Sequence, residues 1–171
     1  KGIIGAFCRT YSIEEVIDKF LPDIYSHVTG DRYSYTKGST SSGLVVYNGG
    51  KFAYSNHGTD PCSGKLVNVW DLVRLHKFGH LDFDAQEGSK LKSYTAMEDF
   101  VREDKDTRKT IALENLSEAK YDFADSDLLI DSEDTVDEVE WMSELEVDGK
   151  GKYLSSAVNL NMIYANDIRL K

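Results

Sequence analysis

Residues 52–79 read FAYSNHGTDPCSGKLVNVWDLVRLHKFG, and the order of features within them decides the fold. An apolar and aromatic run comes first, and a turn rich in Gly, Asp and Pro follows it. After the turn, apolar residues recur with the spacing of one helix face, which Gly79 can end. The residues on this face are Val69, Leu72, Val73 and His76. The segment therefore predicts a strand, a turn and a helix.

The residues just before this segment predict more strands. The runs RYSYTKG, GLVVYN and KFAYS are short, rich in β-branched and aromatic residues, and separated by glycines. Asn48-Gly49-Gly50 between the last two runs is a strong hairpin signal, because asparagine and glycine tolerate a positive φ angle. These patterns indicate a small antiparallel sheet of about three strands.

Helices are expected on both sides of this sheet. Ser12 and Glu15 have capping-box spacing at the start of one helix, and Leu21-Pro22 ends it. After the sheet, a helical pattern runs through residues 93–116. We expect it to break near residues 103–106, where charge is dense.

The C-terminal part is expected to be mostly helical. Residues 121–140 are acidic and aperiodic, which is typical of a linker. Ser155 or Ser156 can cap a closing helix that runs through Ile163. The overall prediction is an α+β fold with flanking helices around the sheet. Its segments are a helix, sheet and helix module (1–95), a helical extension (96–120), the acidic linker (121–140) and a last block (141–171).

Length and composition bound the function classes. At 171 residues with 40% apolar content, the chain can bury one core. Its two cysteines, Cys8 and Cys62, are too sparse for a disulfide-stapled secreted domain and fit a reducing compartment. No apolar stretch approaches the roughly 18–20 residues of a membrane span. We therefore expect a cytoplasmic protein with no membrane contact.

The charge is uneven along the chain. The formal net charge is −10, yet residues 1–95 contain 11 Lys and Arg against 10 Asp and Glu. Residues 96–171 contain 9 against 20, and all four histidines precede them. Because Lys and Arg bind phosphates, the acidic second half is a poor candidate for nucleic-acid binding. That objection does not apply to the first half.

His57, Asp60 and Cys62 lie within six residues and raise the question of a metal site. Structural zinc needs four ligands, usually two pairs brought together by a hairpin. Only one candidate pair exists here, and Cys8 lies in a different element. The other interpretation is a series of turns built by Asp60-Pro61 and nearby glycines, with His57 hydrogen-bonded locally. We favour this metal-free turn and expect no cofactor.

No catalytic group is expected either. A cysteine nucleophile needs an adjacent base, and no such signature surrounds Cys8 or Cys62. Paired carboxylates such as Asp82 and Asp84 lie in polar stretches that are typical of solvated surface. Metal-dependent chemistry would need such pairs on rigid strands beside basic residues. The chain is therefore not expected to be an enzyme.

Basic and aromatic residues alternate around the predicted sheet. They are Arg32, Tyr33, Tyr35, Lys37, Tyr47, Lys51, Phe52 and Tyr54. Exposed aromatic rings beside cations suit base stacking and phosphate contact with single strands. Strand side chains alternate between faces, however, so half of these residues must face the core. Nucleic-acid contact and ordinary core packing both remain open for this pattern.

Three stretches resemble a known family. Residues 43–79, GLVVYNGGKFAYSNHGTDPCSGKLVNVWDLVRLHKFG, resemble a segment of phage and mobile-element replication proteins of the virulence-associated E type. Residues 1–25 resemble the opening of that segment, and residues 149–171 resemble the stretch that leads into the ATPase of those proteins. In that family a primase–polymerase domain precedes the segment and a helicase-like ATPase follows it. The resemblance implies a fragment without either catalytic domain, with those domains as partners and residues 141–171 leading into the helicase-like one.

The order of strand, hairpin, strand, turn and helix also resembles the zinc ribbon of bacterial primases. That family has Cys-x2-His before the hairpin and Cys-x2-Cys after it. Here His57 and Asp60 stand where the second pair would lie, and KGSTSSG supplies only hydroxyls in place of the first. The resemblance therefore implies a zinc-ribbon-like fold without its metal.

These expectations combine into a leading hypothesis and an alternative. The chain would be a non-catalytic module of a phage-type DNA primase–helicase that assists the handling of single-stranded template DNA. The residues expected to contact nucleic acid are Arg32, Lys37, Lys51, His57, Lys65 and Arg74. The alternative is a protein–protein docking or oligomerisation module of the same replication protein, with the acidic second half as its docking surface.

Overall fold

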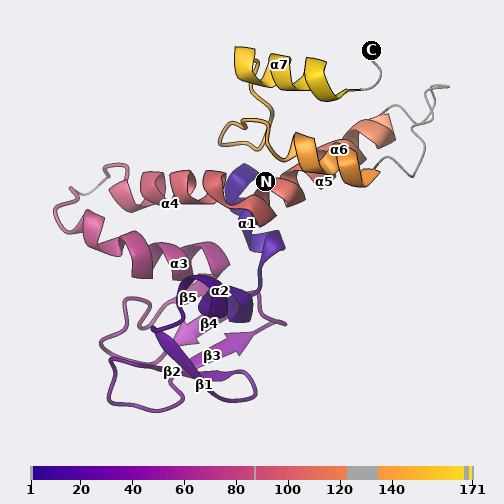
Figure 1. Cartoon of the computed structure of the whole chain (residues 1–171). Helices are drawn as coiled ribbons and strands as arrows, with labels where there is room; N and C mark the ends of the chain where they lie inside the picture. Colours follow the sequence, from indigo (N-terminus) through magenta and orange to yellow (C-terminus); the bar gives the residue numbers. More distant parts are fainter. Residues whose placement is uncertain (1, 87, 123–134, 168–169, 171) are drawn as a thin grey trace. The chain divides into compact units, whose positions relative to one another are not determined.

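The computed structural model describes residues 2–86, 88–122, 135–167 and 170, and its fold is α+β, as expected (Figure 1). The chain divides into two compact units. The sheet unit comprises residues 7–99, and the helical unit comprises residues 1–6 together with residues 100–171. Helices α1 (Gly2–Thr10) and α4 (Lys92–Glu103) each contribute residues to both units. The segment boundaries expected at 95, 120 and 140 stay predictions.

The sheet unit contains a five-stranded antiparallel sheet in which consecutive strands of the chain are neighbours. The strands are β1 (Tyr25–Thr29), β2 (Arg32–Tyr35), β3 (Leu44–Tyr47), β4 (Phe52–Ser55) and β5 (Leu66–Asn68). The three expected strands correspond to β2, β3 and β4, so the expected number was too small. β1 was missed because all its residues after the first are exposed, which hides the alternation. β5 was missed because it is only three residues long.

The Asn48-Gly49-Gly50 turn joins β3 to β4, as expected. Its three residues have positive φ angles of 54°, 62° and 82°. The Gly50 carbonyl also accepts a hydrogen bond from Ile13 N at 2.7 Å, at the start of α2 (Ile13–Phe20). A Cβ atom at Gly50 would lie 2.5 Å from Glu14 Oε2, so the close approach of α2 requires glycine here.

Side chains cap the starts of α2 and α3. The Ser12 hydroxyl accepts from Glu15 N at 3.2 Å, and the Glu15 carboxylate accepts from Ser12 N at 2.7 Å, which confirms the capping box. In α3 (Val69–Phe78), the Asn68 side chain accepts from Asp71 N at 2.9 Å. α3 ends at Phe78 with Gly79 as its C-cap, as the sequence predicted, and a 3₁₀ turn follows from Gly79 to Asp82.

The core of the sheet unit joins the buried face of the sheet to these helices. Phe7 of α1 and Trp70 of α3 are at most 1% exposed, and their rings meet edge to face with centroids 6.2 Å apart. Leu44 and Val46 of β3 are buried on the same side of the sheet. Burying each such side chain stabilises the fold by about 1.5–3 kcal/mol. The hydrophobic effect therefore fixes which face of the sheet is left open.

The helical unit contains three further helices. They are α5 (Lys105–Asp122), α6 (Thr135–Met142) and α7 (Ala157–Asn166). The expected break in the long helical pattern lies at Asp104, which confirms the prediction. The Asp104 carboxylate accepts from Thr107 N at 2.9 Å and from Thr107 Oγ1 at 2.7 Å, so it caps the start of α5.

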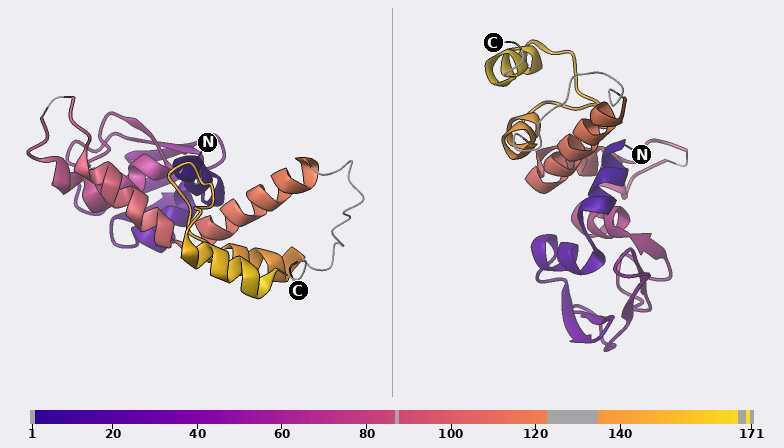
Figure 2. Two further views of the ribbon diagram at one scale, coloured as in Figure 1. Left: turned by 90° about the horizontal axis from the view of Figure 1, so that it is seen from above. Right: turned by 90° about the vertical axis from the view of Figure 1, so that its right-hand side faces the viewer.

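α5 and α6 pack against each other through Ala112, Leu116 and Val139 (Figure 2). Residues 123–134 of the expected acidic linker lie outside the described residues, whereas residues 135–140 belong to α6. Ser156, one of the two expected caps, accepts from Asn159 N at 3.2 Å and begins α7. Across the described part of the chain, no helix combines the length and apolar character needed to cross a membrane.

Candidate functional site

The outward-pointing side chains of β2 to β5 form one surface, which we call the outer face. The strand register places four of them in a row across four strands. In order they are Arg32, Val45, Tyr54 and Leu66. Tyr47 and Phe52 form a neighbouring cross-strand pair on the same side. We keep the name outer face for these six residues, and Ser34 and Asn68, which also point outward, lie at its rim.

Three aromatic rings are grouped on the outer face. Tyr47 is 48% exposed and Phe52 is 37% exposed, while Tyr54 is half-buried. Leu66, which is 63% exposed, extends the apolar surface onto β5. Because the Cβ atoms of directly opposite residues in a sheet lie about 4.5–5.5 Å apart, these side chains form a continuous patch. Grouped, exposed aromatic residues are typical of a binding surface.

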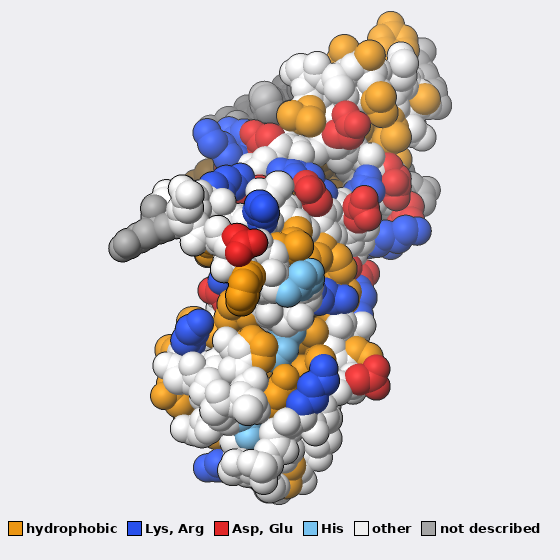
Figure 3. Space-filling model, turned by 90° about the vertical axis from the view of Figure 1, so that its left-hand side faces the viewer, with side chains coloured by type: hydrophobic (Ala, Val, Ile, Leu, Met, Phe, Trp, Pro, Cys, Tyr) orange, Lys and Arg blue, Asp and Glu red, His pale blue; other side chains and the backbone are white. Residues whose placement is uncertain are grey.

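Basic residues accompany this patch. Arg32 lies on the outer face, Lys51 and Lys65 directly precede β4 and β5, and Lys37 lies in the loop between β2 and β3. All four are exposed, and no described outward position of β2 to β5 carries an acidic side chain. Figure 3 shows one side of the molecule, on which blue Lys and Arg groups lie among white and orange groups. Asp31, which is exposed and directly precedes β2, is outnumbered by these cations, so the charge around the outer face suits a polyanion.

Arg74 does not join this surface, contrary to the expectation from the sequence. It is 8% exposed on α3, and its Nη1 donates to Ser93 Oγ at 2.8 Å. Its Nε and Nη2 donate to Asp71 Oδ1 at 3.1 and 2.9 Å. The guanidinium also lies 4.5 Å from the centre of the Tyr94 ring. Because its donors are used inside the protein, we remove Arg74 from the set of phosphate contacts.

His57 is also removed from that set, because it is only 1% exposed. Its Nε2 accepts hydrogen bonds from the backbone N–H groups of Tyr35 at 3.1 Å and Gly43 at 3.2 Å. The expected local hydrogen bonding of the ring is therefore wrong, since both donors lie far away in the sequence. Nε2 therefore acts as an acceptor, whereas Nδ1 of the same ring is buried without a hydrogen-bond partner. The ring joins the β2–β3 loop to the turn after β4.

Asp60 is the centre of a buried hydrogen-bond network. Its Oδ2 accepts from the Tyr25 hydroxyl at 2.8 Å and from the Ser55 hydroxyl at 2.6 Å. Its Oδ1 accepts from Cys62 N at 2.8 Å and lies 3.3 Å from His76 Nε2. The Tyr25 hydroxyl also lies 2.7 Å from His76 Nε2. The network therefore ties the turn to β1, β4 and α3.

The network sets the ionisation of its members. Burial alone raises the pKa of Asp60, but hydrogen bonds, foremost that from His76, outweigh burial and lower the pKa to about 2. Burial raises the pKa of the Cys62 thiol to about 12, and the charge of Asp60 adds to this effect. Burial likewise raises the pKa of Tyr25. At neutral pH the thiol is protonated, which makes Cys62 a poor nucleophile.

The same network bears on the metal question. Asp60, Cys62 and His76 bring three potential ligand atoms within 4.8 Å of one another, whereas His57 is not part of this group. The Tyr25 hydroxyl forms hydrogen bonds with two of these residues, Asp60 and His76. None of the described buried nitrogen or oxygen atoms that lack a partner belongs to Asp60, His76 or Tyr25. These polar groups therefore satisfy one another's hydrogen-bonding capacity within the network.

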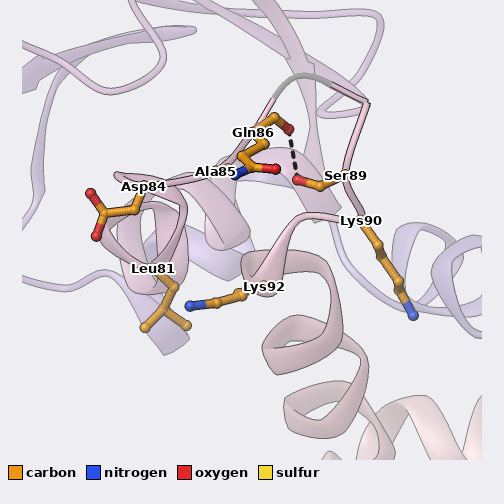
Figure 4. A pocket seen from close by; sticks show the side chains of 7 residues that line it. All are labelled: Leu81, Asp84, Ala85, Gln86, Ser89, Lys90 and Lys92. Carbon is orange, nitrogen blue, oxygen red and sulfur yellow. Dashed lines mark hydrogen bonds between the residues drawn. The ribbon is translucent and has the colours of Figure 1, made fainter.

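A hollow of about 260 Å³ lies outside the sheet, between the 3₁₀ turn and the start of α4 (Figure 4). Among the residues drawn, the Lys90 side chain points away from the hollow, and its ammonium lies 3.8 Å from Glu98. The Ser89 hydroxyl donates to the Gln86 carbonyl at 2.7 Å. The polar groups of this hollow do not converge on one point, so we assign it no function.

The sequence matches no protein-family model, no curated protein and no solved structure. The functional argument therefore depends on the outer face and on the Asp60 network themselves. Of the two, the outer face is open to a partner, whereas the Asp60 network is closed and structural.

Proposed function

We propose that this chain is a non-catalytic module of a phage-type primase–helicase replication protein, and that it handles single-stranded template DNA in the cytoplasm. The observation that carries the proposal is the outer face, with its three grouped aromatic rings and accompanying cations. The resemblance of residues 43–79 to virulence-associated E proteins supplies the replication context. In this proposal the primase and helicase domains of a longer protein are the partners.

Single strands fit the outer face for two physical reasons. Their bases offer flat surfaces that stack on aromatic rings such as Phe52, and their phosphates attract cations such as Arg32. Lys51 directly precedes β4 and Lys65 directly precedes the antiparallel neighbour β5, so two further positive charges lie at opposite ends of this strand pair. Salt-dependent binding of a flexible strand follows from this combination.

A non-catalytic role is supported by how the candidate reactive groups are used. Asp82, one of the paired carboxylates, accepts from Ser93 N at 2.9 Å and lies 3.8 Å from Arg74 Nη1. Cys62 is buried and protonated at neutral pH. Both groups therefore stabilise the fold, and we propose that catalysis belongs to neighbouring domains.

The test is a titration of fluorescently labelled single-stranded DNA followed by anisotropy at several salt concentrations. We expect Arg32→Gln, Lys51→Gln and Lys65→Gln each to weaken binding and to reduce the slope of log K against log salt by about 0.7. Lys92→Gln removes an exposed charge outside the sheet and serves as the matched control. Absence of binding at low salt, or equal effects of all four variants, would refute the proposal.

A second candidate function is docking or self-association through the helical unit. α7 exposes apolar side chains, with Val158 at 55%, Leu160 at 60% and Tyr164 at 73%. Asn159 is 1% exposed and anchors the helix by donating to the carbonyls of Glu146 and Leu154. An anchored helix with exposed apolar side chains is typical of a protein interface.

Surface substitutions test this second candidate better than a deletion of residues 121–171, which would also remove α6. We expect the double variant Leu160→Gln, Tyr164→Gln to reduce self-association in sedimentation-velocity experiments while leaving DNA affinity unchanged. Leu113→Gln changes a similarly exposed leucine on α5, 54% exposed, and is the control. A wild-type protein that sediments as a monomer at every concentration would refute self-association.

A further inference from the structure

The outer face offers flat apolar rings but few groups that could read a base edge. Tyr47 pairs with Phe52, and Tyr54 pairs with both Val45 and Leu66, so rings and aliphatic groups adjoin across three strands. A base that lies on such a surface gains stacking energy whatever its identity, because every base has a π face.

The polar side chains at the rim of the outer face already have partners. Ser34 Oγ accepts from Ser42 N at 2.9 Å, and Asn68 Oδ1 accepts from Asp71 N at 2.9 Å. Base-edge recognition usually needs Asn, Gln, Arg or acidic side chains with free hydrogen-bonding groups. Among the described outward positions only Arg32, on β2, is charged, and one such side chain suits a phosphate better than a sequence of bases.

Duplex nucleic acid is a poor match to the same surface. In a duplex the faces of the bases are covered by their neighbours, so aromatic rings on a sheet reach only phosphates and sugars. The cations around the outer face would still attract a duplex, but the rings would contribute nothing to its binding. The surface therefore distinguishes unpaired from paired bases.

We infer that the outer face binds unpaired bases by stacking on Tyr47, Phe52 and Tyr54, without selecting base sequence or the sugar of the strand. The inference rests on the proposed function and deepens it, because it names the recognised group as the face of an unpaired base. Single-stranded DNA and single-stranded RNA share that group. The cations then contribute affinity, and the rings contribute the preference for single strands.

The test compares four labelled ligands of equal length: oligo-dT, oligo-rU, an oligomer of abasic deoxyribose phosphate, and a DNA duplex. For the wild-type protein we expect oligo-dT and oligo-rU to bind within about threefold of each other. The abasic oligomer and the duplex should bind about tenfold more weakly, since stacking of one base is worth roughly that factor. The abasic oligomer isolates the phosphate contribution.

Variants assign the effect to the rings. Phe52→Leu and Tyr54→Leu should lower oligo-dT affinity to that of the abasic oligomer and leave the abasic affinity unchanged. Phe83→Leu is the matched control, because Phe83 is 92% exposed and lies outside the sheet. Thermal unfolding of each variant shows whether the fold is retained.

The outcomes separate this inference from the proposed function. Equal binding of oligo-dT and the abasic oligomer by the wild-type protein overturns stacking but leaves a DNA-binding module intact. A tenfold preference for oligo-dT over oligo-rU overturns the tolerance of the sugar. Failure of all four ligands to bind at low salt overturns the proposed function itself.

Discussion

His57 and Asp60 lie three residues apart in one turn, yet their side chains belong to separate hydrogen-bond networks. The His57 ring accepts from the backbone N–H groups of Tyr35 and Gly43 in the direction of the β2–β3 loop. The Asp60 carboxylate accepts from Tyr25 and from the turn itself. The two networks hold the turn from two sides. This turn precedes β5, which lies at the edge of the outer face.

This division shows how a side chain connects two loops, the β2–β3 loop and the turn after β4. Here the His57 ring lies between the two loops, and a Cβ atom added at Gly43 would come within 2.5 Å of its Nε2. The ring therefore fills the space between the loops and satisfies two backbone donors there.

Replacing His57 is expected to destabilise the sheet unit. His57→Ala would leave a cavity and two buried backbone N–H groups without an acceptor, and each unsatisfied donor costs about 1–3 kcal/mol. We expect the free energy of unfolding, measured with urea, to fall by at least about 2 kcal/mol. His80→Ala alters an exposed histidine and should change it by less than about 0.5 kcal/mol. Equal stabilities for the two variants would contradict the bridging role of His57.

The lowered pKa of Asp60 leads to a prediction of how the stability of the protein depends on pH. Its pKa in the folded protein, about 2, lies below the ordinary value of 3.8, so the ionised carboxylate favours the folded state. This stabilisation is present above pH 4 and is lost as pH falls toward 2, and it amounts to about 2 kcal/mol. Urea unfolding between pH 6 and pH 2 should therefore show a smaller loss of stability for Asp60→Asn than for the wild-type protein. If the free energy of unfolding falls equally with pH in the two proteins, the ionisation of Asp60 does not contribute to the pH dependence of stability.

The contacts of Tyr25 lead to a prediction about the metal content of the protein. Because its hydroxyl forms hydrogen bonds with Asp60 and His76, we expect purified protein to contain no stoichiometric zinc, as measured by elemental analysis. Tyr25→Phe removes the hydroxyl and should lower the free energy of unfolding by about 1–2 kcal/mol, since a buried carboxylate loses a donor. One zinc per wild-type chain that is lost in Cys62→Ser would overturn the hydrogen-bonded centre.

The sequence predicts well those features that depend on neighbouring residues. The sequence predicted the capping box at Ser12, the hairpin at Asn48 and the cap at Ser156, because a cap or a tight turn requires particular residues within three or four positions. The sequence did not predict β1, since its exposed residues show no alternation between apolar and polar side chains. Local chemistry therefore gave most of the fold.

The candidate site was less predictable because its partners are distant in the chain. Tyr25 meets Asp60 across 35 positions and His76 across 51, and no spacing rule connects them. The apolar face of α3 was predicted to include His76, but periodicity does not show that its ring reaches a carboxylate. Likewise, the pattern of aromatic residues did not show which of them, such as Tyr47, would face outward until the strand register was known.

Arg74 and Arg32 give a last prediction, because the two arginines are expected to have opposite effects. Arg74→Gln should lower the free energy of unfolding by about 2 kcal/mol, since Asp71 and Ser93 lose a buried charged donor. Affinity for single-stranded DNA, measured by anisotropy well below the unfolding temperature, should stay within about twofold of wild type. Arg32→Gln should leave stability within about 0.5 kcal/mol of wild type and weaken DNA binding, because Arg32 is exposed. Weaker DNA binding by a fully stable Arg74→Gln protein would return Arg74 to the interface and contradict the division between a structural helix and a binding sheet.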